Sequence, residues 1–126
     1  MRYNSVLDLH THTVASGHAY CSLREMAKAA SEKGLEVLGI TEHAPSMPGT
    51  CHKFYFNNLK VVPREMYGIQ LLLGSEVNIL DAQGTVDLEE KTLSNMDVVI
   101  ASLHTPCMKP ASRQKNTESY LNVVGT

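Results

Sequence analysis

The chain has 126 residues, a formal net charge of −2 at pH 7, and a composition that is 43% hydrophobic and 6% aromatic. This length suits one domain with a buried core, although it is short for a complete α/β barrel. The weak negative charge and the absence of tryptophan argue against a nucleic-acid or membrane-surface binder. No apolar run approaches the roughly 20 residues that cross a bilayer, and no signal-peptide pattern is evident at the start.

Three cysteines lie far apart, at positions 21, 51 and 107, and none of them belongs to a C-x-x-C pair. This pattern favours reduced thiols over a disulfide or a zinc–cysteine site. We therefore expect a cytoplasmic location.

Hydrophobic patterns in the first part of the chain predict alternating strands and a helix. Residues 5–10 predict a strand that ends in polar residues. Ser22 and Glu25 have the spacing of a capping box, and the amphipathic pattern after Ser22 predicts a helix over 23–33. The apolar run over 35–41 predicts a second strand that is buried on both faces, as in a parallel sheet.

The alternation continues after a predicted loop over 44–55, which is long enough to be a binding loop or a lid. The order of elements predicts an α/β fold with parallel strands, in which ligands gather at the C-terminal strand ends. The elements expected there are a helix over 57–67, a strand over 70–79, a short helix over 88–95, a strand over 97–103 and a helix beginning within 117–124.

Potential metal ligands lie near the ends of all four predicted strands. His10 and His12 form an H-x-H pair, and alternate residues of a strand share one face. His43, Glu76 and His104 lie close to the ends of the next three apolar runs. Imidazoles and a carboxylate at one edge of a sheet suit a divalent transition metal. The H-x-H pair alone would fit two surface histidines equally well, so the repetition along the chain supports the metal site.

Five segments together resemble the PHP (polymerase and histidinol phosphatase) superfamily, and they match its YcdX-like phosphatase subgroup best. The segments are D-L-H-T-H-T at 8–13, S-G-H-A-Y at 16–20, I-T-E-H-A-P at 40–45, G-S-E-V-N-I at 74–79 and A-S-L-H at 101–104. The resemblance implies a distorted (β/α)7 barrel with metal ligands at the C-terminal strand ends. It also implies a trinuclear centre of zinc, manganese or iron, in which a metal-bridging hydroxide hydrolyses a small phosphorylated substrate.

The same resemblance assigns ligands to as many as three metals and gives Glu76, His10 and His12 the role of positioning the hydroxide. A carboxylate can bridge two cations because it has two oxygens. His10 and His12 would bind the first metal, and Glu76 would bridge that metal to another. His18 and His43 would bind the second metal, and His104 together with Glu76 would bind the third.

Two features depart from the family pattern. Many relatives have Thr-Asp-His where this chain has Thr41-Glu42-His43, with a longer carboxylate. The family's later His-Pro and Asp-x-His motifs have no counterpart after His104, because residues 105–126 contain neither histidine nor aspartate. We therefore expect residues 1–126 to be the N-terminal portion of a PHP domain, about its first half. A half-barrel would leave an unpaired strand edge that is open to self-association.

Two alternatives to a phosphatase stay open. One is a catalytically inactive fragment or a metal-binding or interaction module, since each metal would lack a protein ligand within this chain. The other is a PHP-type nuclease or phosphodiesterase, which the weak basic character disfavours.

Further polar residues are weaker candidates for the site. Asp8 is expected on the face of the H-x-H pair, either as a partner of an imidazole or in a simple buried hydrogen bond. His52 is expected to be an exposed loop residue rather than a substrate contact. Lys60 and Arg64, one helical turn apart, suit either a phosphate or a solvated face. Cys107 is expected to neighbour the site without binding metal.

Overall fold

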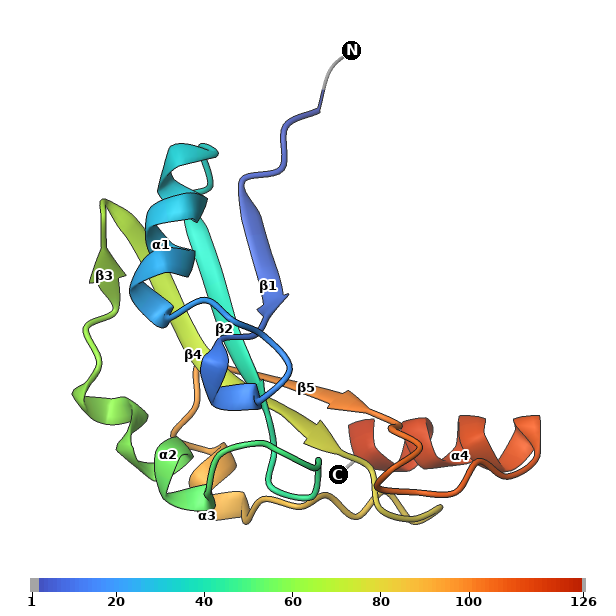
Figure 1. The fold of residues 1–126 in the computed structure, drawn as a ribbon. Coiled ribbons are helices and arrows are strands. Elements are labelled where there is room, and N and C mark those ends of the chain that lie inside the picture. Colours follow the sequence, from blue (N-terminus) through green and yellow to red (C-terminus); the bar gives the residue numbers. More distant parts are fainter. Residues whose placement is uncertain (1–2, 126) are drawn as a thin grey trace.

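The computed structural model describes residues 3–125, and it contains one sheet with helices packed around it (Figure 1). Most of the sheet is parallel, as predicted. The elements are β1 (Leu7–Thr11), the 3-10 helix η1 (Val14–Ser16), α1 (Leu23–Glu32), β2 (Val37–His43), α2 (Lys53–Asn58), the 3-10 helix η2 (Leu59–Val61), β3 (Glu65–Met66), β4 (Ile69–Asn78), α3 (Glu90–Leu93), β5 (Val98–Ser102) and α4 (Arg113–Val124).

The sheet is organised around β4. Strands β1, β2, β4 and β5 run parallel in that spatial order, and the short β3 pairs antiparallel with the start of β4. Because β4 is ten residues long, one of its edges holds β3 at Ile69 and Gln70 and then β5 from Gly74 onward. Among the described residues, β1 and β5 each pair on one side only. The fold is therefore α/β, with a parallel sheet that forms an open half-barrel.

The hydrophobic core lies between the sheet and the helices α1 and α2. Leu38 pairs in register with Leu71, and Ile40 pairs with Leu73, so these four side chains share one face of β2 and β4. They join Ala27 of α1 in one buried cluster. Figure 1 shows α1 alongside β2 and β4, which it contacts. Each fully buried leucine or isoleucine contributes about 1.5 to 3 kcal/mol of burial free energy. Alternation places the register partners His43 and Glu76 on the other face of the two strands.

Helix α1 begins where the capping box predicts. The Ser22 hydroxyl accepts the Glu25 backbone N–H at 3.3 Å, and the Glu25 carboxylate accepts the Ser22 backbone N–H at 2.6 Å. These two bonds satisfy donors that a helix start otherwise leaves unpaired. The prediction for 23–33 is confirmed to within one residue.

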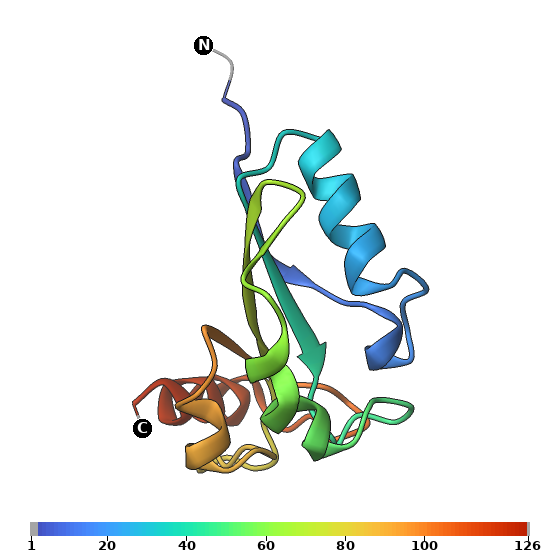
Figure 2. The same ribbon diagram turned by 90° about the vertical axis from the view of Figure 1, so that its left-hand side faces the viewer.

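The helix predicted over 57–67 is wrong in position. Helix α2 begins at Lys53, inside the predicted loop, because the His52 side chain caps it by accepting the Phe54 backbone N–H at 3.1 Å. The helical segment ends at Val61, before Pro63, since proline disfavours helical backbone at the residue that precedes it. Tyr67, at a φ of 53°, then turns the chain into β4. Helix α2 lies beside α3 in both views (Figures 1 and 2).

Two other boundaries differ from the prediction. Strand β2 continues to His43, so this expected ligand lies within the strand and not after it. The last helix begins at Arg113, before the expected 117, because the Ser112 hydroxyl caps it by accepting the Lys115 backbone N–H at 3.3 Å. Within residues 3–125, no helix is long and apolar enough to cross a membrane.

Candidate metal centre

Five of the six predicted ligands converge at the C-terminal ends of the parallel strands. His10 lies in β1, and His12 follows the last residue of that strand. His43 ends β2 and pairs in register with Glu76 of β4. His104 lies two residues beyond β5, which pairs with the same segment of β4. The order of the strands therefore places imidazoles on both sides of the one carboxylate.

The Glu76 carboxylate faces four imidazoles at once. Its Oε2 atom is 3.2 Å from His10 Nε2, 3.3 Å from His12 Nε2 and 3.0 Å from His43 Nδ1. Its Oε1 atom is 3.2 Å from His104 Nε2. The Glu76 side chain is only 4% exposed, so solvent provides little screening of these contacts. The rings also lie close together, with His12 stacked on His43 at a centroid distance of 4.3 Å.

These contacts fit a shared cation. Glu76 Oε2 and His43 Nδ1 are buried and have no hydrogen-bond partner, although they face each other. Two ligand atoms on one tetrahedral zinc ion lie about 3.4 Å apart, given metal–ligand distances of about 2.1 Å. The observed separations of 3.0 to 3.3 Å are close to that value. Within residues 3–125, two groups of three residues each have ligand atoms within 4.8 Å of one another, and both contain Glu76: His10–His12–Glu76 and His43–Glu76–His104.

The protonation states also suit metal binding. Burial lowers the pKa of His12, and burial together with the nearby His12 charge lowers the pKa of His43 to about 4. Burial acts to raise the pKa of Glu76, but the Ser102 side chain and the imidazoles around the carboxylate outweigh it, so this pKa is lowered. Neutral imidazoles and an ionised carboxylate are the forms that bind a metal ion.

The comparisons with known proteins agree with this geometry. The family model for the PHP domain matches residues 8–124, which is nearly the whole chain. The chain belongs to the PHP domain family. Its curated relatives include proteins named "Probable phosphatase" from Clostridium novyi, 56% identical over 124 residues, and from Clostridium botulinum, 51% identical over 124 residues. A third, from Caldanaerobacter subterraneus, is 46% identical over 125 residues.

These alignments cover nearly all of this PHP chain but only part of each relative. In all three, 98% of the chain is covered. The covered share is 50% of the two Clostridium proteins and 49% of the Caldanaerobacter protein. The chain therefore spans about half the length of the curated relatives it matches.

Acid should destabilise the metal-free PHP chain through His43. The unfolded chain binds a proton at this residue near the ordinary pKa of about 6.5, whereas the folded chain does so only near 4. The unfolded state therefore holds more protons between these values, and stability falls as the pH falls through this window. We expect a loss on the order of 1 to 3 kcal/mol from pH 7 to about pH 4.5.

Urea unfolding in the presence of a chelator measures this loss. The variant His43→Asn should lose the part of the pH dependence that comes from position 43, because asparagine does not titrate, while His12, whose pKa is also lowered, keeps its own smaller contribution. Equal pH dependence in the two proteins would contradict the assignment to His43.

His18 lies beside the cluster but outside both groups. Its ring centroid is 5.2 Å from that of His43, and its Nε2 donates to the Pro48 carbonyl oxygen at 3.0 Å. The loop is held in place because Gly17, at a φ of 74°, packs against Gly49, whose carbonyl oxygen would lie 2.1 Å from a Cβ there. With Nε2 engaged, the Nδ1 atom of His18 keeps the lone pair. Its role as a metal ligand stays a prediction.

Asp8 makes neither of the two contacts expected of it. The register between β1 and β2 shifts between Asp8 and Thr11, which interrupts the alternation that would place Asp8 with the two histidines. Its Oδ1 accepts the His10 backbone N–H at 3.1 Å, and the residue is exposed. The structure thus assigns Asp8 an ordinary local hydrogen bond.

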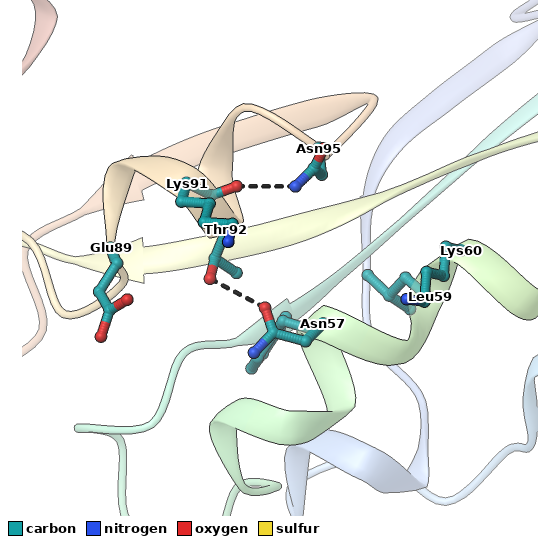
Figure 3. Close-up of a pocket in the computed structure, with 8 residues that line it drawn as sticks. Asn57, Leu59, Lys60, Glu89, Lys91, Thr92 and Asn95 are labelled. Carbon is teal, nitrogen blue, oxygen red and sulfur yellow. Dashed lines mark hydrogen bonds between the residues drawn. The ribbon is translucent and has the colours of Figure 1, made fainter.

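Arg64 and Lys60 do not share a helix face. The Arg64 Nε pairs with Asp97 Oδ2 at 2.7 Å, and its guanidinium also donates to two backbone carbonyls. Lys60 lines a cavity of about 580 Å³ between α2 and α3, which Thr92 spans with a hydrogen bond to Asn57 (Figure 3). None of the predicted metal ligands lines this cavity. Neither cation supports a phosphate site at the histidine cluster.

Two buried hydrogen-bond networks behind the cluster are absent from the sequence prediction. Glu42 is fully buried, and its carboxylate accepts the Thr13 backbone N–H at 3.0 Å as well as the hydroxyls of Thr13 and Ser16. Ser16 in turn lies 3.1 Å from His12 Nδ1. The one feature of the sequence that could have pointed to this network is the Glu42 carboxylate, directly before His43. No local pattern identifies Ser16, because its partners come from other elements.

The second network supports His104. Its Nδ1 atom is 2.7 Å from the Asn78 side-chain oxygen, and Asn78 is fully buried. Strand alternation from Glu76 is the signal that could have identified Asn78, since the two share a face of β4. Cys107 is near this region, where its backbone N–H donates to the His104 carbonyl oxygen at 2.9 Å. Its side chain belongs to neither metal-binding group among the described residues.

Proposed function

We propose that this chain carries the metal centre of a phosphatase that hydrolyses small phosphomonoesters. The observation that supports the proposal most directly is the buried Glu76 carboxylate, which faces four imidazoles and whose Oε2 atom has no hydrogen-bond partner among the described residues. The relatives named probable phosphatases support the same reaction class. The proposal includes that the chain belongs to a YcdX-like subgroup and that it forms the first half of the barrel.

The chain's own residues suffice for two metal positions that share Glu76. His10 and His12 would complete one position, and His43 and His104 would complete the other. A trinuclear centre, with His18 on the third metal, is the fuller form of the proposal. Zinc, manganese and iron all suit imidazole and carboxylate ligands. When bound, such ions activate water at neutral pH and neutralise charge on phosphoryl oxygens.

The exposure of the cluster indicates where a substrate would approach. The His10 side chain is 48% exposed, whereas those of His12, His43 and His104 are 12% to 22% exposed. A small phosphomonoester can therefore reach the centre from the β1 side, while the other imidazoles form the interior of the site. The weak negative charge of the chain does not favour a nucleic-acid substrate.

Hydrolysis of a chromogenic phosphomonoester tests this proposal on the purified chain. After loading with zinc or manganese, we expect turnover that a chelator abolishes and that exceeds turnover of a matched phosphodiester. Preferred cleavage of the phosphodiester would favour the nuclease or phosphodiesterase alternative. Bound metal without turnover would contradict the proposal that these 126 residues are an active enzyme, and it would favour the alternative of a metal-binding module.

Two further expectations accompany the proposal. The three cysteines are free in the structure, which supports a reducing, cytoplasmic location. The edge of β5 that pairs with no other strand of residues 3–125 supports self-association or pairing with another segment.

A further inference from the structure

The hydrogen bonds of Ser16 determine which nitrogen of His12 carries a proton. The Ser16 hydroxyl has one hydrogen and three polar neighbours: the Glu42 carboxylate, the His43 backbone N–H at 2.9 Å, and His12 Nδ1 at 3.1 Å. The backbone N–H can only donate, and an ionised carboxylate can only accept. The hydroxyl hydrogen therefore goes to Glu42, in the stronger, charge-assisted bond. His12 Nδ1 must then donate to Ser16, which leaves its Nε2 with the lone pair.

The same reasoning applies independently to His104. The side-chain Nδ2 of Asn78 donates to the Ala44 carbonyl oxygen at 3.2 Å and to the Asp87 carboxylate at 2.6 Å. Both of these groups are acceptors, so the orientation of the amide is determined and its oxygen faces His104. The contact of 2.7 Å between that oxygen and His104 Nδ1 requires the imidazole to donate. The Nε2 atom of His104 again keeps its lone pair.

We propose that Ser16 and Asn78 are positioning residues that hold His12 and His104 as Nδ1–H tautomers. Each imidazole then presents an Nε2 lone pair to the central carboxylate of Glu76. Lone pairs that face a carboxylate at 3.2 to 3.3 Å repel it unless a cation lies between them. The two networks therefore prepare the site for a metal ion before it binds, and this inference rests on the proposed metal centre.

Nitrogen chemical shifts test the tautomers in the metal-free protein. The 126-residue chain with ¹⁵N-labelled histidine is treated with a chelator, and two-bond proton–nitrogen correlations identify the protonated nitrogen of each ring. We expect His12 and His104 to carry the proton on Nδ1. An Nε2–H form at either residue in the wild-type chain would overturn the proposal, whether or not the chain binds metal.

Ser16→Ala tests the network behind His12, and Ser75→Ala is its matched control. Both serines are fully buried, and Ser75 donates its hydroxyl to the Glu42 backbone carbonyl oxygen at 3.1 Å and not to an imidazole. In Ser16→Ala we expect His12 to shift toward the Nε2–H form, while His104 in the same spectrum keeps its tautomer. In Ser75→Ala we expect neither ring to change.

Zinc affinity, measured by competition with a chromophoric chelator, gives the second readout. We expect Ser16→Ala to weaken binding by about 10- to 100-fold, the usual cost of losing a group that orients a metal ligand. We expect Ser75→Ala to bind within about twofold of wild type. Equal affinity in Ser16→Ala and wild type would overturn the positioning role, whereas zinc binding by neither protein would contradict the proposed metal centre instead.

A second variant keeps the test decisive if Ser16→Ala does not fold. In Glu42→Gln, the amide can donate to Ser16, whose hydroxyl is then free to donate to His12 Nδ1. We expect this variant to carry the His12 proton on Nε2 and to bind zinc more weakly. An unchanged His12 tautomer in folded Glu42→Gln would contradict the relay through Ser16.

Discussion

Glu76→Gln should weaken zinc binding by more than about 100-fold, beyond the usual cost of losing an outer-shell partner. The substitution keeps the shape of the side chain, but it replaces a charged oxygen with an NH2 group that cannot bind a cation. Both groups of potential ligands contain Glu76, so one change damages two metal positions at once. The same variant should have no measurable phosphatase activity in a complete enzyme.

Competition with a chelator measures the affinity, and Glu89→Gln is the matched control. Glu89 is also a glutamate, but its side chain is 77% exposed, lies 3.8 Å from Lys53 and is outside the cluster. We expect Glu89→Gln to bind zinc as tightly as wild type. If Glu76→Gln matched this control, the metal centre would have to lie elsewhere.

Gly74→Ala should destabilise the chain by about 3 kcal/mol or more, at the upper end of the cost of overpacking. A Cβ at position 74 would lie 1.7 Å from the backbone oxygen of Val98, where β4 and β5 pair. A backbone atom in a sheet cannot move aside as a flexible side chain can. The strand must separate locally, and because β5 leads to His104, the histidine should leave the cluster.

Urea unfolding of the metal-free chain gives the stability, and Gly34→Ala is the comparison. Gly34 has a φ of +80° but open space around it. Alanine there should lower the free energy of unfolding only by the cost of a left-handed backbone conformation, about 1 to 2 kcal/mol. Gly74→Ala should therefore cost more than Gly34→Ala. The reverse order would show that the β4–β5 contact is not as close as the structure has it.

The central part of the fold and site follows from local sequence patterns. The apolar runs predict the cores of β2 and β4, and parallel strands bring their C-terminal residues to the same edge. His43 and Glu76 are register partners for this reason. The H-x-H pair at the end of β1 then needs only the pairing of β1 with β2 to approach Glu76.

Other features depend on contacts that no local pattern contains. The start of α2 depends on a cap by His52, a residue that seldom signals a helix start. The local contact of Asp8 depends on a register shift between two strands. The support of His12 by Ser16 depends on Glu42, which comes from a different strand. Such partners become neighbours only when the sheet is assembled.

Anomalous diffraction at the zinc absorption edge, from crystals of the chain grown with zinc, tests the metal centre most directly. We predict a peak between Glu76 and the pair His10 and His12, and a second between Glu76 and the pair His43 and His104. Each peak should lie about 2.0 to 2.2 Å from its ligand atoms. Zinc found only at other positions, with no peak within that distance of Glu76, would contradict the account.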